Sequence, residues 1–171
     1  FLKERHLRSI LIFCGTKEKT KSLTRELKKM KLSVDEMHSD IDQQARENVM
    51  NRFKARQLNI LVATDILSRG IDIEDIDLVI NYDVPHDSED YIHRVGRTAR
   101  AESEGEAITL IGEKEQRKFA AIEEFLGHSV EKLTVPAFLG ECPVYNPVKK
   151  KKSGGKFHKG SGKRNFGKKK Q

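Results

Sequence analysis

The chain has 171 residues, of which 36% are hydrophobic and 35% are charged, a balance that allows one compact domain with a tail. No apolar run approaches the roughly 20 residues of a bilayer-spanning helix, so we expect no transmembrane helix in this chain and no membrane partner. The net charge of +7 comes from residues 149–171, which hold 11 of the 33 Lys and Arg residues and no acid, so the remainder is slightly acidic.

Strand-like and helix-like patterns alternate along the chain. Short apolar runs predict strands, and apolar residues at helical spacing, such as Leu23, Leu27 and Met30, predict helices. Asp87 is the expected N-cap of one helix. In chain order we predict strand 9–13, helix 17–30, strand 33–38, helix 42–55, strand 58–63, strand 77–82, a helix beginning in 87–96, strand 106–111 and helix 114–126.

Apolar strands separated by helices predict an α/β fold, namely a doubly wound parallel sheet of about five or more strands with helices on both faces. In such a sheet, ligands bind beyond the carboxyl ends of the strands. The pattern fails after Val135. We therefore expect one domain over residues 1–136, a proline-containing linker over 137–148 and a disordered basic tail over 149–171.

Two of the predicted strand ends carry polar residues that a phosphate could use. Gly15 would let a ligand approach the backbone after the first strand, and Thr16 offers a hydroxyl, although a plain turn with Thr16 as N-cap explains the same residues. Gln43 and Arg46 lie one turn apart at a helix start, where anions are favoured. The alternative for this pair is the solvated face of a surface helix.

The segment ATDILSRGIDI follows the clearest strand and combines unusual side chains. Thr64 offers a hydroxyl, Gly70 allows a close backbone approach, and Asp72 could accept hydrogen bonds from sugar hydroxyls. A structural turn is the alternative, but such a turn does not need all of these residues together.

The segment YIHRVGRTAR carries arginines at every third position, next to His93. On a helix, Arg94, Arg97 and Arg100 would fan over about 120° of one side. A solvated charged face is one explanation. The consistent use of arginine rather than lysine favours forked contacts with phosphate.

Together these segments resemble the C-terminal RecA-like domain of DEAD-box ATP-dependent RNA helicases, a branch of helicase superfamily 2. LIFCGTKEKT is similar to motif IV, QQAR to the QxxR motif, ATDILSRGIDI to motif V and HRVGRTAR to motif VI. The resemblance covers residues 5–136. The basic tail after the LGECPVYNP segment resembles bacterial RhlE-type members.

The resemblance implies roles for individual residues and for ATP with Mg²⁺, which would be bound mainly by an N-terminal lobe. Arg97 and Arg100 would reach the γ-phosphate, with one as the arginine finger, and Asp72 would hold the ribose. His93 and Arg94 would contact the N-terminal lobe. The RNA backbone would be held by Gly15, Thr16, Gln43, Arg46, Thr64 and Gly70. No residue of this chain is expected to bind a metal directly.

The sequence lacks the phosphate loop and the Asp-Glu-Ala-Asp and Ser-Ala-Thr motifs of the N-terminal lobe. We therefore predict half of an RNA helicase, which neither hydrolyses ATP nor unwinds RNA alone. The alternatives are an RNA-binding or partner-recruiting module without a catalytic role, and a superfamily 2 DNA helicase. The buried position expected for Cys14 favours a reducing, cytoplasmic location, and we expect a monomer.

Overall fold

The computed structural model describes residues 7–65, 76–98, 105–133, 135, 138, 140 and 143–147. Its strands are β1 Ile10–Cys14, β2 Val34–Met37, β3 Ile60–Thr64, β4 Leu78–Asn81 and β5 Glu106–Thr109. Its helices are α1 Lys17–Lys29, α2 Gln43–Lys54, α3 Ser88–Val95 and α4 Gln116–Leu126, with short 3-10 helices η2 Gly96–Thr98 and η3 Glu113–Glu115. No described helix is long and apolar enough to span a membrane.

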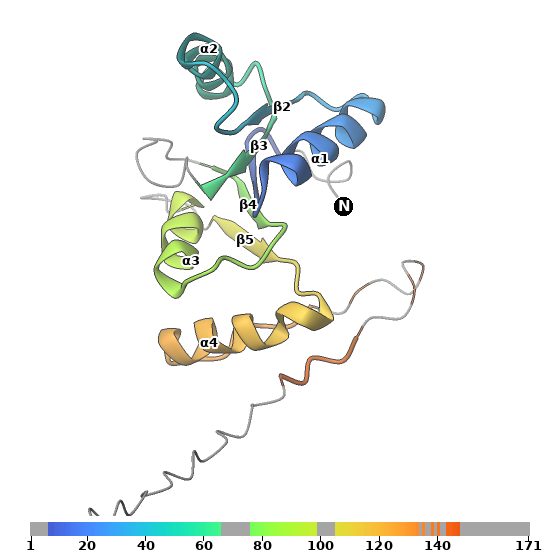
Figure 1. Ribbon diagram of the computed structural model, residues 1–171, viewed down its shortest axis with the longest axis vertical. Coiled ribbons are helices and arrows are strands. Elements are labelled where there is room, and N and C mark those ends of the chain that lie inside the picture. Colours follow the sequence, from blue (N-terminus) through green and yellow to red (C-terminus); the bar gives the residue numbers. More distant parts are fainter. Residues whose placement is uncertain are drawn as a thin grey trace, which may run out of the picture.

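The five strands form one parallel sheet in the order β2-β3-β1-β4-β5 (Figure 1). Cys14 is paired with Thr64, and Phe13 is paired with Asn81. The strands therefore end at nearly the same level, and we call this side of the sheet the carboxyl edge and the opposite side the amino edge. This architecture confirms the predicted doubly wound α/β fold.

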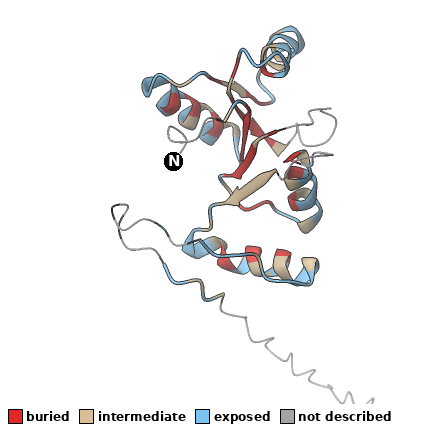
Figure 2. Ribbon diagram, turned by 180° about the vertical axis from the view of Figure 1, so that it is seen from behind, coloured by how far each residue is buried: buried red, intermediate tan, exposed pale blue. Residues whose placement is uncertain are grey.

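Helices cover both faces of the sheet because alternate strand residues point to opposite sides. Ile12 and Val62 belong to the apolar cluster that packs with Leu27 of α1. Phe13 belongs to the other cluster, which includes Phe53 of α2. Figure 1 shows α1 on one side of the strands, with α2 and α3 on the other. Figure 2 shows the central strands buried and the outer helix surfaces exposed.

Asp side chains cap the N-termini of α2 and α3. Asp87 accepts a 2.8 Å hydrogen bond from the backbone N–H of Asp90, which confirms the predicted N-cap of α3. Asp42 caps α2 in the same way. The predicted strand 106–111 is shorter in the structure, where the edge strand β5 ends at Thr109 and Leu110 beyond it is 46% exposed. Cys14 is buried, as predicted.

The C-terminal stretch 143–147, which we call the strap, packs against α4. The Gln116 side chain pairs with its backbone, donating to the Val144 carbonyl at 2.9 Å and accepting from the Asn146 N–H at 2.8 Å. The Tyr145 ring meets Phe119 edge-on, with 6.3 Å between ring centres. This part of the predicted linker 137–148 is therefore attached to the domain. The tail 149–171 lies outside the described residues.

Candidate functional site

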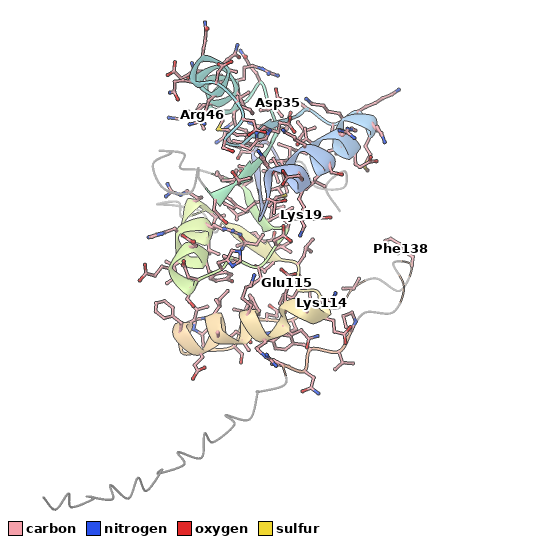
Figure 3. The ribbon with its side chains drawn as sticks, viewed as in Figure 1. Lys19, Asp35, Arg46, Lys114, Glu115 and Phe138 are labelled. Atoms are coloured by element: carbon pink, nitrogen blue, oxygen red, sulfur yellow. The ribbon has the colours of Figure 1, made fainter. Side chains whose placement is uncertain are left out.

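Five of the residues predicted to contact RNA lie at the carboxyl edge. Gly15 and Thr16 follow β1, Gln43 and Arg46 lie in the first turn of α2, and Thr64 is the last residue of β3. Since β2, β3 and β1 are adjacent and parallel, the loops that follow them open on the same side. Figure 3 marks Lys19 on α1 and Arg46 on α2, the two helices beside this part of the sheet.

The turn after β1 is held by the loop after β4. The Asp83 carboxylate accepts a 2.8 Å hydrogen bond from the Gly15 N–H and forms an ion pair with Lys19. The Thr16 hydroxyl accepts a hydrogen bond of 3.2 Å from the Lys19 N–H, so Thr16 is the N-cap of α1. The alternative interpretation of this turn, with Thr16 as the N-cap of a helix, is therefore observed. Contact of Gly15 and Thr16 with RNA stays a prediction.

Arg46 and Thr64 each carry a buried polar atom without a partner. Arg46 Nε and Thr64 Oγ1 make no hydrogen bond among the residues that the structure describes, and the other end of the guanidinium reaches the Ile41 carbonyl at 3.5 Å. Leaving such a group unpaired inside a protein costs about 1–3 kcal/mol, so each of these two atoms needs a partner such as a water molecule or a ligand. Gln43 differs, since it is exposed and donates to Glu47 at 2.8 Å, as on a solvated helix face.

Lysines on the first turns of α1 add positive charge beside this edge. Lys17 and Lys21 each donate to Asp40, in the loop after β2, at 2.9 Å. The hydrogen bonds from Lys21 and Lys17 hold the pKa of the Asp40 carboxyl well below its usual range. These lysines are not among the residues predicted from the sequence, although KEKTK places them with Lys19 at the start of one helix.

Arg94 is the side chain that joins several loops at the carboxyl edge. It is completely buried, and Nε donates to Asp65 Oδ1 at 2.7 Å while Nη2 contacts the same oxygen. Nη1 donates to Asn81 Oδ1 at 3.0 Å and to the Asp83 carbonyl at 3.1 Å. The guanidinium also lies 4.9 Å from the centre of the Phe13 ring. The contact of Arg94 with an N-terminal lobe stays a prediction. In this structure its guanidinium bonds to Asp65, Asn81 and Asp83 of the same lobe.

The backbone of Arg97 lies at the opposite, amino edge, which corrects the expectation that ligand-binding residues follow the carboxyl ends of the strands. Its carbonyl accepts a hydrogen bond from the Ile76 N–H, just before β4 begins. Thr98 packs against Gly105, just before β5, where an added Cβ would lie 2.0 Å from the Thr98 carbonyl oxygen. Because β4 and β5 are parallel, α3 must return the chain to the amino edge. The strand register places Ile76, which is bonded to the Arg97 carbonyl, six residues before the level of Thr64. This is a distance of about 20 Å along the strands.

The remaining predicted site residues are placed less fully. His93 is exposed on α3. Gly70, Asp72 and Arg100 lie outside the described residues, so their roles stay predictions. Within the described part of the chain, no group of three or more His, Cys, Asp or Glu side chains could hold a metal ion.

Cys14 lies at the end of β1 but is not a reactive group. Burial, with the nearby negative charge of Asp83, raises the pKa of its thiol to about 11. A thiol with this pKa is almost entirely protonated near pH 7, so it acts as a small apolar side chain.

Comparisons with known proteins show the family to which this chain belongs. Residues 1–102 match the family described as the helicase conserved C-terminal domain. ATP-dependent RNA helicase DbpA of Bacillus subtilis is 46% identical over 129 residues. That alignment covers 75% of this chain but 27% of the relative, so the chain spans about a quarter of the relative's length.

Two solved structures have a similar fold. The C-terminal domain of the DEAD-box protein Dbp5 has a TM-score of 0.68 and 32% identity, and the match covers 74% of each chain. Dbp5 of S. cerevisiae bound to RNA and ADP BeF3 also has a TM-score of 0.68 and 32% identity, with 73% of this chain and 34% of that chain covered.

Proposed function

The chain belongs to the helicase conserved C-terminal domain family, among the C-terminal domains of DEAD-box proteins, and we propose that it is the second lobe of an ATP-dependent RNA helicase. One observation carries the proposal for this chain. Arg46 Nε and Thr64 Oγ1 are buried and lack partners among the described residues, on neighbouring loops of one sheet edge. These are polar groups that the oxygen atoms of a sugar–phosphate backbone can satisfy.

RNA is the ligand that fits the carboxyl edge. Arg46 offers the planar donors that match a phosphate, and Lys17, Lys19 and Lys21 add positive charge nearby. The Lys17 and Lys21 side chains are 44% and 41% exposed, so a phosphate can compete with Asp40 for their ammonium groups. The Dbp5 complex with RNA and ADP BeF3 supports RNA and a nucleotide as ligands of this lobe.

ATP with Mg²⁺ would bind between this lobe and an N-terminal lobe, which would supply most of the contacts. Arg97 and Arg100 would face the γ-phosphate, and Asp72 would hold the ribose. An arginine finger can accelerate phosphoryl transfer by about 10³–10⁵-fold because it stabilises charge that develops in the transition state. In this arrangement RNA and ATP approach the lobe at different edges of the sheet.

The basic tail, residues 149–171, would add a second RNA-binding segment to the proposed helicase. Residues 149–171 combine 11 basic side chains with Phe157 and Phe166, so they suit unpaired RNA through phosphate contacts and base stacking. The strap fixes the chain just before this tail to α4. The RhlE-type assignment rests on the tail and the LGECPVYNP segment alone, whereas the relative reported above is a DbpA protein. A monomeric, cytoplasmic protein stays our expectation.

The experiment that tests the catalytic role uses the full-length helicase that contains this chain. Arg97→Ala should abolish RNA-stimulated ATP hydrolysis and spare RNA binding without nucleotide. Arg25→Ala, on the exposed face of α1, is the control. Loss of RNA binding with intact ATP hydrolysis would instead favour the binding module, which the family match does not support. Equal stimulation by DNA and RNA would contradict the RNA specificity.

A further inference from the structure

Asp40 holds two lysines of the carboxyl edge with one carboxylate. Lys17 and Lys21, one turn apart on α1, each donate a 2.9 Å hydrogen bond to it, one to each carboxylate oxygen. All three side chains are between 40% and 44% exposed, so the cluster is open to a ligand. The oxygen atoms of a phosphate accept hydrogen bonds from ammonium groups in the same way. The Asp40 carboxylate therefore takes the contacts that an RNA phosphate could make with these lysines.

The loop after β2, which carries Asp40, has other contacts that hold its shape. The buried His38 side chain accepts a hydrogen bond from the Asp40 N–H at 3.3 Å, and the His38 carbonyl accepts one from the Ile41 N–H at 3.3 Å. Asp42 then caps α2. Ion pairs between exposed side chains add little stability. The lysines can therefore leave Asp40 while the loop keeps its shape.

The same loop leads to residues that are proposed to contact RNA. Ile41 follows Asp40 in the chain, and its carbonyl accepts a 3.5 Å hydrogen bond from the Arg46 guanidinium. On α1, Lys17 directly follows Thr16, the N-cap of that helix. A phosphate bound to the lysines would therefore lie beside both the turn after β1 and the start of α2.

We propose that Asp40 is a built-in competitor of RNA phosphate, which occupies Lys17 and Lys21 until an RNA backbone displaces it. This inference rests on the proposed RNA-binding function. The competition lowers the affinity of the edge for any single phosphate, so stable binding needs an RNA that also reaches Arg46 and Thr64. A competing contact of this kind raises specificity and lowers affinity. It also returns the two lysines to a partner when RNA leaves.

The test compares Asp40→Asn with the wild type in the full-length helicase. RNA affinity is measured by fluorescence anisotropy of a labelled single-stranded RNA at several salt concentrations. Asparagine keeps the shape of the side chain and removes the charge that holds the lysines. We expect binding at low salt to tighten by about three- to tenfold, and the slope of log affinity against log salt concentration to steepen by about 0.7–1.4, as for one or two added phosphate contacts.

Asp35→Asn is the matched control, because Asp35 also pairs with two basic side chains, Lys28 at 3.2 Å and Arg52 at 2.8 Å. Those partners lie in the last turns of α1 and α2, whereas the first turns of both helices lie at the carboxyl edge. The affinity and the slope of Asp35→Asn should therefore match the wild type.

A double variant, Lys17→Gln with Lys21→Gln, tests whether Asp40 acts through the lysines. In that background Asp40→Asn should leave RNA affinity unchanged, because the carboxylate has no lysine left to compete for. Equal tightening by Asp40→Asn with and without the two lysines would overturn the proposal, since the effect would then be one of net charge. Equal tightening in Asp35→Asn would overturn it for the same reason.

Two further results would contradict the role given to Asp40. Weaker RNA binding in Asp40→Asn would mean that the carboxylate orders the lysines for RNA. An unchanged affinity and slope would mean that it does not compete with RNA. The wild type separates this inference from the proposed function. If the wild-type helicase does not bind RNA, the proposed function fails, whereas if it binds RNA and Asp40→Asn binds no more tightly, only the role of Asp40 fails.

Discussion

The Asp83 carboxylate accepts a 2.8 Å hydrogen bond from the Gly15 backbone N–H, which fixes the turn after β1 to the loop after β4. The same carboxylate pairs with Lys19 of α1. Its side chain is only 13% exposed, so water competes weakly for these contacts. Asp83 thus holds the turn after β1, which is proposed to contact RNA.

Asp83→Ala should lower the free energy of unfolding by about 0.5–1.5 kcal/mol, because it removes the acceptor of the hydrogen bond from the Gly15 N–H. Urea unfolding followed by circular dichroism measures this loss. Glu124→Ala, at an exposed position of α4, should change it by less than about 0.5 kcal/mol. Equal stabilities for the wild type and Asp83→Ala would show that the hydrogen bond does not hold the turn.

The strap should contribute measurable stability through Tyr145. Its hydroxyl donates a 2.6 Å hydrogen bond to Glu123, so Tyr145→Phe should cost about 1–2 kcal/mol at pH 7. Val144→Ala is the matched control, because the Val144 side chain is 84% exposed. An unchanged unfolding free energy in Tyr145→Phe would mean that the strap is not held by this bond.

Glu123 gives the strap a defined pH dependence. Burial acts to raise the pKa of Glu123, but hydrogen bonds from Lys132, Tyr145 and Val130 outweigh it, so the net shift is downward from 4.5. A lowered folded-state pKa stabilises the protein above the unfolded value, and this contribution is lost as the pH falls through the folded-state value. The stability difference between Glu123→Gln and the wild type should therefore shrink between pH 7 and pH 3. A constant difference would contradict this assignment.

Much of the fold follows from apolar patterning, whereas the parts that depend on single polar contacts do not. Runs such as LNILVA identify β3 because the strand is buried along its whole length. The strap was predicted as a linker because PVYNP has no apolar periodicity. Its attachment depends on the Gln116 side chain, which pairs with backbone, and on the hydrogen bond from Tyr145 to Glu123. Patterning cannot reveal such a contact.

The candidate site likewise contains some positions that the sequence predicts and others that it does not. The sequence identifies Arg46 and Thr64 through their place after strands, and the structure places both at the carboxyl edge. Three arginines at every third position suggest one common surface, but Arg94 is buried. Arg97 lies at the other edge because α3 returns the chain to the start of β5. The length of a helix and its direction across the sheet, rather than residue spacing, decide these positions.

Removal of residues 149–171 should weaken RNA binding at low salt and flatten its salt dependence. Each phosphate contact that is lost removes about 0.7 from the slope of log affinity against log salt concentration for single-stranded RNA. Fluorescence anisotropy with a labelled single-stranded RNA at several salt concentrations measures both effects. An unchanged affinity and slope would refute the role of the tail as an RNA tether.

The most direct test of RNA binding at the carboxyl edge is the RNA affinity of Arg46→Gln in the full-length helicase without its tail. Loss of charged hydrogen bonds to phosphate should weaken binding by about 10–100-fold. Stability should change little, because the hydrogen bond given for the Arg46 guanidinium is a long one, 3.5 Å to the Ile41 carbonyl, and Nε has no described partner. Arg52→Gln, six residues further along the same helix, should bind RNA like the wild type. Wild-type affinity in Arg46→Gln, or equal losses in both variants, would contradict an RNA site at this edge.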